Sequence, residues 1–498
     1  MQKKYILALD SGTVKNRAVI FDEQANIVSV VKKELTTYHP QPGWIEQDAE
    51  EIWSAQLWAA ERAIYEAGIR KSEIVAIGVT NQRETTVVWN RHNGRPIYPA
   101  ISWQSRQTRE ICEKIKADGM EEEFRQKTSL VVNPYFSATK IRWILEKVPG
   151  AMELAKKGDL LFGTIDTWLM WKLSGGEIFA TDYSNASRTM LYHLRKLKWD
   201  KNLLRHMGIP ISMMPEVHPS SHIYGTTSAS VFGLKIPIAG DIGNQQADLF
   251  GQACFDKGMA KNTYGEGSFF LLNTGQEYVY SQNGLITTIA WGIGDEITYA
   301  LEGSVFVSGA ALEWLKNRLG VLHSLQESEW MARHVDDTHG VYFVPAFRGL
   351  SAPYWEMQTT GMLIGLREDT EKEHIVRAAL AAMAYQVRDV YEAIISDANA
   401  AISELRVDGG ASRNNLLLQI QANVLGIPVL RAQDEETTAL GAAYMAGLAT
   451  GVWNSLEEIR ALWREDARFE PFMTEEEREA AYDGWQNAVS HAMGWSKG

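Results

Sequence analysis

The sequence predicts an α/β protein of two domains, the first over residues 1–250 and the second over residues 251–498, with a cleft between them. Its 498 residues are too many for a single hydrophobic core. Each half begins with a strand, a glycine-containing turn and a second strand. Strands and amphipathic helices then alternate in both halves, as is typical of α/β proteins. We therefore expect a duplicated fold, with a boundary near residue 250 that no linker marks.

The first half opens with three short apolar segments that we expect to be strands. The segments at 5–9, 18–21 and 26–31 are separated only by turns, which predicts a meander rather than a strand–helix–strand unit. Residues 51–67 have helical periodicity, and residues 74–79 form a continuous apolar run typical of a buried strand. Further strands are expected at 160–162 and 236–239.

The second half has a similar succession of predicted strands, turns and helices. Strands are expected at 259–264 and 268–272, on either side of the turn Gly265-Glu266-Gly267. Long helices are expected at 307–319 and 374–394, and a glycine-rich helix at 437–448. A strand at 405–408 runs into a glycine turn, and we expect the next helix to begin near Ser412, a good N-cap residue.

Composition and charge narrow the class of protein. The formal net charge is −13, which argues against a nucleic-acid partner because phosphate backbones are bound by basic surfaces. The apolar stretch before Asp10 is too short for a signal-peptide core, and no later run reaches the length of a membrane span. The two cysteines, Cys112 and Cys254, are too few for a disulfide scaffold. We expect a cytoplasmic protein without a membrane span.

The turn Asp10-Ser11-Gly12-Thr13 is typical of a phosphate-binding hairpin. Glycine lets backbone N–H groups come close to phosphate oxygens, and Thr13 adds a hydroxyl donor. The carboxylate of Asp10 suits Mg²⁺ held through water. The alternative interpretation of this motif alone is a plain hairpin with an Asx turn.

A second candidate is the segment VDGGAS at 407–412, where a strand ends and a helix is expected. Such a turn presents N–H groups and the positive end of a helix to an anion or a nucleotide. By itself this motif has an alternative interpretation too, since glycine pairs also serve packing in α/β loops.

Taken together, the motifs relate the sequence to a known family of proteins. Over nearly its whole length it resembles glycerol kinases, within the wider FGGY family of sugar and polyol kinases. The matching segments are QPGW at 41–44, TNQRETT at 80–86, GTIDTWL at 163–169, NASRTM at 185–190, AKNTYG at 260–265 and RVDGGAS at 406–412. The resemblance implies two actin-like (ribonuclease H-like) domains that close over ATP, Mg²⁺ and a small polyol such as glycerol. It also implies a homodimer or homotetramer.

The resemblance assigns roles to individual residues. It implies that Asp10 and Arg17 act in catalysis, with Asp10 as the metal ligand. The residues implied to contact glycerol are Arg83, Glu84, Trp103, Tyr135, Gln245 and Phe269. Such directed hydrogen bonds and an apolar wall suit a small triol. The residues implied to bind the nucleotide are Gly12, Thr13, Gly265, Glu266, Gly267, Gly309, Glu313, Gly410 and Asn414.

The sequence departs from the family at the implied general base. The family has an aspartate there, and this chain has Asn244 in the stretch Gly243-Asn244-Gln245-Gln246. A carboxamide cannot accept the hydroxyl proton, and general-base catalysis is typically worth ~10²–10⁴ in rate. We therefore expect strongly impaired turnover, although phosphoryl transfer relies mostly on positioning and charge stabilisation.

The residues of the implied phosphate site also differ from those of the family. Glu266 stands where the family has threonine, and its carboxylate would face the phosphates of ATP. We hypothesise that Lys15 or Arg348 pairs with Glu266 and partly fills the phosphate space. The alternative is that these side chains point to solvent and ATP binds normally. The other departures on this side are Ser11, Val14, Glu313, Ser351 and Arg413.

Two aspartates could compensate for the lost base. Asp248 lies one helical turn after Asn244, on the same face, and Asp241 is also unusual for the family. We prefer the interpretation of Asp248 as a charge on the helix surface. Two functions remain open: an impaired homologue that binds glycerol as a sensor, partner subunit or regulator, and an active ATP-dependent kinase of glycerol or another polyol, with Asp248 as a candidate base. Repurposed chemistry in the same pocket is less favoured.

Overall fold

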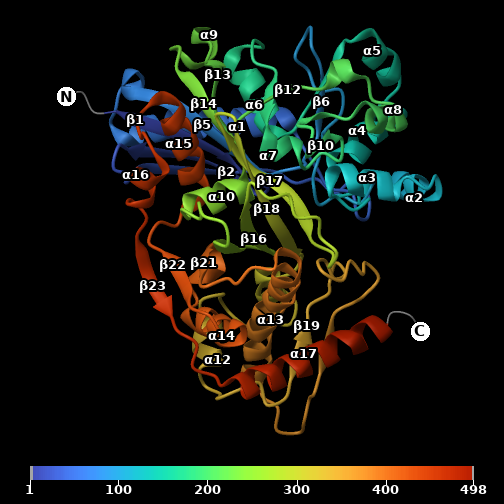
Figure 1. Cartoon of the computed structure of the whole chain (residues 1–498), viewed down its shortest axis with the longest axis vertical. Helices are drawn as coiled ribbons and strands as arrows, with labels where there is room; N and C mark the ends of the chain where they lie inside the picture. The colour runs from blue at the N-terminus through green and yellow to red at the C-terminus, as the bar shows by residue number, and fades with distance from the viewer. Residues whose placement is uncertain (1–3, 496–498) are drawn as a thin grey trace.

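The computed structural model describes residues 4–495 and consists of two α/β bodies stacked along the longest axis (Figure 1). A single sheet of thirteen strands runs through both bodies, in the order β23-β22-β21-β15-β16-β18-β17-β13-β14-β5-β1-β2-β3. Most side chains of the central strands are buried on both faces of the sheet, so these strands read as apolar runs in the sequence.

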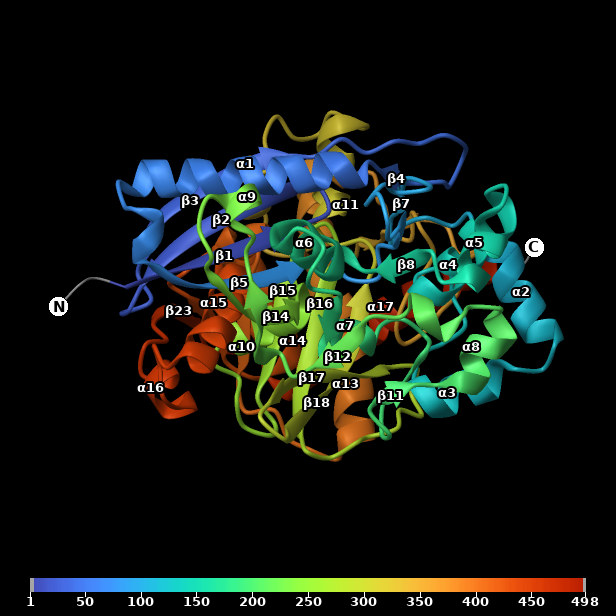
Figure 2. The same ribbon diagram turned by 90° about the horizontal axis from the view of Figure 1, so that it is seen from above.

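The first body is built on a five-strand unit. Its strands are β1 (Tyr5–Ser11), β2 (Lys15–Asp22), β3 (Ile27–Glu34), β5 (Ile74–Asn81) and β14 (Pro237–Gly243). The first three strands are antiparallel, which confirms the predicted meander, and β5 and β14 then add in parallel to β1. Helix α1 (Ala49–Ala67) crosses the face of β2 and β3, as Figure 2 shows from above.

The second body repeats the same order of strands. Its unit consists of β18 (Glu296–Val305), β16 (Ser268–Gly275), β15 (Ala260–Tyr264), β21 (Leu405–Asp408) and β22 (Val429–Ala432). The first three are antiparallel, and β15, β21 and β22 are parallel. The expected duplicated architecture of two actin-like units is therefore confirmed. Strands β13 (Ser221–Thr226) and β17 (Ile286–Ile293) join the two units in the middle of the sheet, and β23 (Glu465–Phe469) ends it.

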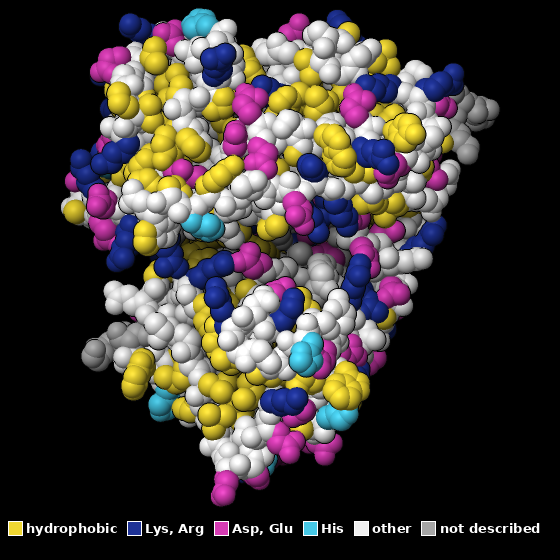
Figure 3. Space-filling model, turned by 180° about the vertical axis from the view of Figure 1, so that it is seen from behind, with side chains coloured by type: hydrophobic (Ala, Val, Ile, Leu, Met, Phe, Trp, Pro, Cys, Tyr) yellow, Lys and Arg dark blue, Asp and Glu magenta, His cyan; other side chains and the backbone are white. Residues whose placement is uncertain are grey.

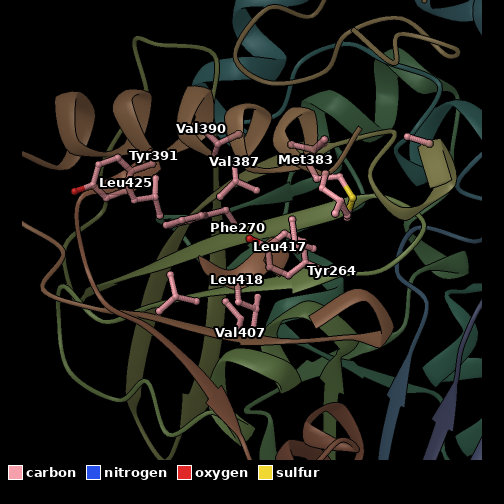
Figure 4. Close-up of a cluster of buried hydrophobic side chains, with 14 of the residues drawn as sticks. Tyr264, Phe270, Met383, Val387, Val390, Tyr391, Val407, Leu417, Leu418 and Leu425 are labelled. Carbon is pink, nitrogen blue, oxygen red and sulfur yellow. The ribbon is translucent and has the colours of Figure 1, made fainter. Parts of the chain in front are cut away.

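The long helices hold the second body together. Helix α13 (Lys372–Ala398) packs on β16 and β18, and helix α14 (Asn415–Leu425) packs on α13 and β22. Their apolar side chains meet those of the strands in one buried cluster, part of which is shown in Figure 4 around Tyr264, Phe270 and Met383. Burial of such side chains contributes roughly 1.5–3 kcal/mol each, which fixes the strand ends where the site forms.

The chain returns to the first body near its end. Helix α15 (Thr437–Thr450) packs against β1, β5, β14 and helix α10 (Asn244–Gly251), and α16 (Leu456–Arg460) follows it there (Figure 1). Gly78 and Gly240 allow this close approach, because a Cβ at either position would lie within 2.6 Å of the α15 backbone.

The remaining elements surround this frame. They are β4 (Glu46–Gln47), β6 (Val87–Asn90), β7 (Ala100–Ile101), α2 (Arg109–Ala117), α3 (Glu121–Thr128), α4 (Ser137–Lys147), α5 (Ala151–Lys157), β8 (Leu160–Gly163), α6 (Ile165–Ser174), β9 (Ala180–Asp182), α7 (Tyr183–Ala186), β10 (Tyr192–His193), β11 (Lys198–Trp199), α8 (Lys201–Met207), β12 (Glu216–His218), α9 (Ala229–Phe232), α11 (Gly309–Asn317), α12 (Glu327–Ala332), β19 (Tyr342–Val344), β20 (Met362–Ile364) and α17 (Glu475–Trp495). Among residues 4–495, no helix has the length and apolarity needed to cross a bilayer.

One predicted helix start is wrong. The glycine turn after β21 continues as a short 3₁₀ helix, Gly410–Arg413, and α14 begins two residues later. Asn414 is its N-cap, because its Oδ1 accepts a hydrogen bond of 2.9 Å from the N–H of Leu417. The hydroxyl of Ser412 donates to the carbonyl of Gly409 at 2.7 Å, so it is not available to cap the helix.

Candidate functional site

The two bodies enclose one large cavity of about 1560 Å³. From behind, the surface is hollowed between the bodies, with charged side chains along the edge (Figure 3). The cavity lies at the carboxyl ends of β1, β14, β15 and β21, where open α/β sheets commonly bind ligands. All predicted site residues line it: Asp10, Gly12, Thr13, Arg17, Arg83, Glu84, Trp103, Tyr135, Asn244, Gln245, Gly265, Glu266, Gly267, Phe269, Gly309, Glu313, Gly410 and Asn414.

A buried network of charges forms the inner end of the cavity. Arg83 binds both carboxylate oxygens of Glu302, with Nη1–Oε2 at 2.5 Å and Nη2–Oε1 at 2.9 Å. Arg188 joins Glu302 to Glu84, through Nη2–Oε1 at 3.0 Å and Nε–Oε1 at 2.6 Å. Burial acts to raise the pKa of Glu302, but the neighbouring Arg188 and Arg83 lower that pKa to about 2. Glu302 is therefore held in its ionised form between the two arginines.

This network also fixes the backbone of Glu84. The residue has a φ of 61°, in the left-handed region that non-glycine residues rarely adopt. Arg188 binds the side chain of Glu84 and holds it in place. The backbone carbonyl of Glu84 accepts a hydrogen bond of 3.1 Å from the hydroxyl of Ser137. Glu302 and Arg188 were not predicted as site residues, because only their contacts with Arg83 and Glu84 connect them to the cavity.

Aromatic rings form one wall of this end. The ring of Trp103 lies 5.5 Å from that of Tyr135 and 6.3 Å from that of Phe269, between ring centroids. The indole Nε1 of Trp103 donates a 2.9 Å hydrogen bond to the hydroxyl of Thr13. The apolar wall is therefore tied directly to the turn between β1 and β2.

Asn244 begins α10 where β14 ends. Its Oδ1 accepts a hydrogen bond of 2.9 Å from the N–H of Gln245. The Oε1 of Gln245 in turn accepts a 2.5 Å bond from the ammonium of Lys261, which also donates to Thr263 at 2.6 Å. Lys261 is fully buried, and burial lowers the pKa of its ammonium.

Asp248 is buried, so its interpretation as a surface charge is wrong. Only 2% of the residue is exposed, because α10 packs between β15 and the start of α15. Its Oδ1 accepts from the hydroxyls of Thr437 and Thr438 at 2.8 and 2.7 Å, and its Oδ2 accepts from Thr263 at 2.8 Å. The ammonium of Lys261 lies 3.7 Å from Oδ2.

Asp241 lies outside the cavity lining. It is fully buried within β14, beside Asp166 and Asp182. Burial and these two carboxylates raise the pKa of Asp241 well above its ordinary value, which favours the neutral form. Its position removes it from the candidates for a base in this cavity.

The two glycine turns face each other across the cavity. Asp10 lies at the end of β1 with its Oδ2 2.5 Å from Nη1 of Arg17. Burial raises the pKa of Asp10, and Arg17 opposes this effect. Lys15 lines the cavity, and among residues 4–495 its ammonium forms no ion pair. The N–H of Gly12 donates to the carbonyl of Lys15 at 3.1 Å, so the groups of this turn that fit a hydrated Mg²⁺ ion and a phosphate are the carboxylate of Asp10 and the N–H of Thr13.

Glu266, in the opposite turn, forms an ion pair with Arg348. This confirms the pairing with Arg348; Lys15 is not the partner. Gln104, from the first body, donates to Oε2 of Glu266 at 3.4 Å, and Arg106 donates to the carbonyl of Arg348 at 2.8 Å. The pair is therefore also a contact between the two bodies at the mouth of the cavity.

The outer end of the cavity is formed by α11, α12 and the turn from Gly410 to Asn414. Asn414 donates to the hydroxyl of Ser328 at 3.3 Å, and Glu313 accepts from Asn317 at 2.8 Å. These contacts leave an open, partly polar space beside the backbone of Gly309 and Gly410.

Comparison with known proteins gives full-length matches. The model of the FGGY family of carbohydrate kinases, N-terminal domain, matches residues 5–251, and that of the C-terminal domain matches residues 260–450. The glycerol kinase of Desulforamulus reducens is 55% identical over 497 residues, which are 100% of this chain and 99% of that protein. Glycerol kinase 2 of Thermotoga maritima is 54% identical over 494 residues, 99% of this chain and 100% of that protein.

Solved structures agree with these matches. The crystal structure of Plasmodium falciparum glycerol kinase with ADP superposes with a TM-score of 0.92 at 34% identity, covering 98% of both chains. A xylulose kinase from Lactobacillus acidophilus superposes with a TM-score of 0.87 at 20% identity, covering 99% of both, and supports the fold alone.

Proposed function

The chain belongs to the FGGY family of carbohydrate kinases, and on this premise we propose that it is a glycerol kinase homologue that binds a small polyol but transfers phosphate slowly. The family reaction takes ATP and glycerol to ADP and sn-glycerol 3-phosphate. ATP is the proposed nucleotide because the related Plasmodium protein binds ADP. When bound, Mg²⁺ would neutralise phosphate charge, and Asp10 is its proposed ligand.

The proposed polyol site is the inner end of the cavity. Arg83 donates to one hydroxyl and Glu84 accepts from another, while Trp103, Tyr135 and Phe269 cover the carbon chain. Gln245 adds a donor through its amide nitrogen. The buried network of Glu302 and Arg188 behind Arg83 and Glu84 supports this proposal, because it holds both side chains in one orientation before the ligand arrives.

One observation carries the proposal of slow transfer: the residue that lines the cavity at the implied base position is Asn244, and its side-chain oxygen accepts from the N–H of Gln245. A carboxamide has no basic site, so the attacking hydroxyl finds a donor where it needs an acceptor. The loss corresponds to about 3–5.5 kcal/mol in the barrier. The Glu266–Arg348 pair adds a second obstacle, since a carboxylate borders the proposed phosphate space.

The alternative is a working ATP-dependent kinase of glycerol or another small polyol. It is favoured by identity of 55% to glycerol kinases over the full length. In this alternative Asp248 is the candidate base, but both of its oxygens already accept hydrogen bonds from threonine hydroxyls. Because both oxygens are occupied, the proton of the attacking hydroxyl would pass to water. Phosphoryl transfer tolerates this because its transition state is loose.

Titration of the purified protein separates the two functions. We expect glycerol to bind by calorimetry, and ADP release in the presence of glycerol and Mg-ATP to rise about 10²-fold or more in the double variant Asn244→Asp, Glu266→Thr. Glycerol-dependent turnover that is already fast in the unaltered chain, and that the double variant does not increase, would support the alternative.

Assembly and location are also part of this proposal. A homodimer or homotetramer remains a prediction that size-exclusion chromatography with light scattering tests. A cytoplasmic location is supported by Cys112 and Cys254, which are both free thiols.

A further inference from the structure

Lys140 is a fully buried lysine behind the inner end of the cavity. It is the fourth residue of α4, and none of its surface is exposed to solvent. Its ammonium donates to three consecutive backbone carbonyls, those of Pro134 at 2.8 Å, Tyr135 at 2.5 Å and Phe136 at 3.2 Å. All three N–H groups of the ammonium are therefore bound by one short segment of backbone.

The position of this charge is unfavourable. A cation in the first turn of a helix opposes the helix dipole, and burial removes the ammonium from water. Burial lowers the pKa of Lys140 to about 7, although the carboxylate of Glu84 acts to raise it. A second titratable neighbour is the thiol of Cys112, on α2, whose own pKa burial raises to about 12. Local rules of this kind are most often broken at functional sites, so the segment that Lys140 binds is a candidate for a functional role.

This segment carries part of the aromatic wall of the cavity. Tyr135 lines the cavity, and its ring lies 4.9 Å from that of Phe136 and 5.5 Å from that of Trp103, between ring centroids. The guanidinium carbon of Arg188 lies 5.6 Å from the ring centroid of Tyr135 and 5.4 Å from that of Phe136. Arg188 therefore packs on the rings, and Lys140 holds the backbone from which they project.

The same segment supports Glu84. The hydroxyl of Ser137, at the start of α4, donates to the carbonyl of Glu84 at 3.1 Å, where the backbone has a φ of 61°. A residue keeps such a strained conformation only while its surroundings hold it there. Movement of the segment would therefore displace both the ring of Tyr135 and the backbone of Glu84.

We propose that Lys140 is a positioning residue of the polyol site: its ammonium holds residues 134–137, so that Tyr135 and Glu84 keep the orientations in which they contact the ligand. Lys140 does not itself line the cavity, so it acts only through these two residues. The inference rests on the proposed function, because the ligand is the polyol of that proposal. It adds a dependence of that site on pH.

Loss of a proton from Lys140 would release part of this hold. A neutral amine has two N–H groups and a lone pair, so one of the three carbonyls would lose its donor. With a pKa of about 7, Lys140 is charged at pH 6 and mostly neutral at pH 8.5, and the affinity for polyol should fall across this range. Unfolding does not produce the same effect. Because the pKa in the folded protein lies below the ordinary 10.5, the contribution of Lys140 to stability increases as the pH rises above 7.

Calorimetric titration of the full-length protein with glycerol tests this inference, since glycerol has no group that titrates near neutral pH. We expect Lys140→Met to raise the Kd about tenfold at pH 6. In the unaltered chain the Kd should rise about threefold or more between pH 6 and 8.5, and in Lys140→Met it should stay nearly constant.

The matched control is Lys71→Met. Lys71 also donates to a backbone carbonyl, that of Phe232 at 2.8 Å, but it does not line the cavity or contact the segment at 134–137. Lys71→Met should bind glycerol with the affinity and the pH dependence of the unaltered chain. If Lys140→Met does not fold, the pH dependence of the unaltered chain decides the matter.

Hydrogen exchange followed by mass spectrometry gives a readout that needs no ligand. At one fixed pH, the amides of residues 135–140 should exchange faster in Lys140→Met than in the unaltered chain, and Lys71→Met should leave them unchanged. Unchanged exchange of these amides in Lys140→Met would overturn the inference, and so would an unchanged Kd for glycerol. If the unaltered chain binds no glycerol, the proposed function fails, and the exchange measurement alone decides whether Lys140 holds the segment.

Discussion

Glu302, in the second half of the chain, binds Arg83, in the first half, through both carboxylate oxygens, at 2.5 and 2.9 Å. Neither side chain is accessible to solvent beyond a few per cent, so this pair lies in a medium of low dielectric. The pair connects β18 to the segment after β5, and therefore the two bodies to each other at the inner end of the cavity.

Removing the charge of Glu302 should destabilise the protein strongly. In Glu302→Gln, Arg83 and Arg188 keep their charges but lose the carboxylate between them, which leaves an uncompensated buried cation. We expect the free energy of unfolding to fall by about 3–5 kcal/mol, measured by urea denaturation. The exposed pair of Arg62 and Glu66 gives a matched control, and Glu66→Gln should cost less than about 1 kcal/mol. Equal effects of the two variants would contradict the prediction.

The same carboxylate predicts a pH dependence. The pKa of Glu302 is about 2 in the folded protein and 4.5 ordinarily, so the folded state holds the ionised form more strongly. Its stabilising contribution is complete above pH 4.5 and is lost as the pH falls toward 2. We expect the difference in unfolding free energy between the unaltered chain and Glu302→Gln to be constant from pH 8 to 5. By pH 3 it should have decreased by about 2 kcal/mol. A difference that is unchanged at pH 3 would show that the pKa of Glu302 is close to 4.5.

How far the site could be predicted from the sequence differs from residue to residue. The two glycine turns were predicted correctly because each lies between adjacent strands, so local pattern determines the hairpin. Asp248 was placed on the correct helical face, but its burial was missed because its partners, Thr263 and Thr437, come from distant segments. Glu302 was missed for the same reason, since 219 residues separate it from Arg83. Short-range periodicity carries no information about which distant strand an ion pair will join.

Glu266 and Arg348 should control the affinity for nucleotide. Repulsion between a carboxylate and a phosphate is about 4 kcal/mol at ~4 Å and an effective dielectric of about 20, and both Arg348 and solvent reduce it. We expect Glu266→Thr to lower the Kd for Mg-ATP about tenfold, measured by calorimetry. Arg348→Ala should raise the Kd, because Glu266 is then unpaired. Glu476→Thr on the exposed face of α17 is the control for loss of one negative charge. Nucleotide affinity that is insensitive to Glu266→Thr would show that this side chain does not face the phosphates.

Lys261 should position Gln245 in addition to stabilising the fold. In Lys261→Met, Asp248 keeps its charge without the nearby ammonium, and we expect the free energy of unfolding to fall by about 3 kcal/mol. The double variant Lys261→Met, Asp248→Ala removes both charges and should recover most of that loss. The affinity for polyol should stay about tenfold lower in both variants, because the amide of Gln245 no longer has the donor that fixes its oxygen. Full recovery of polyol affinity in the double variant would show that Lys261 acts through stability alone. Persistent loss of affinity in a stable protein would assign it the positioning role.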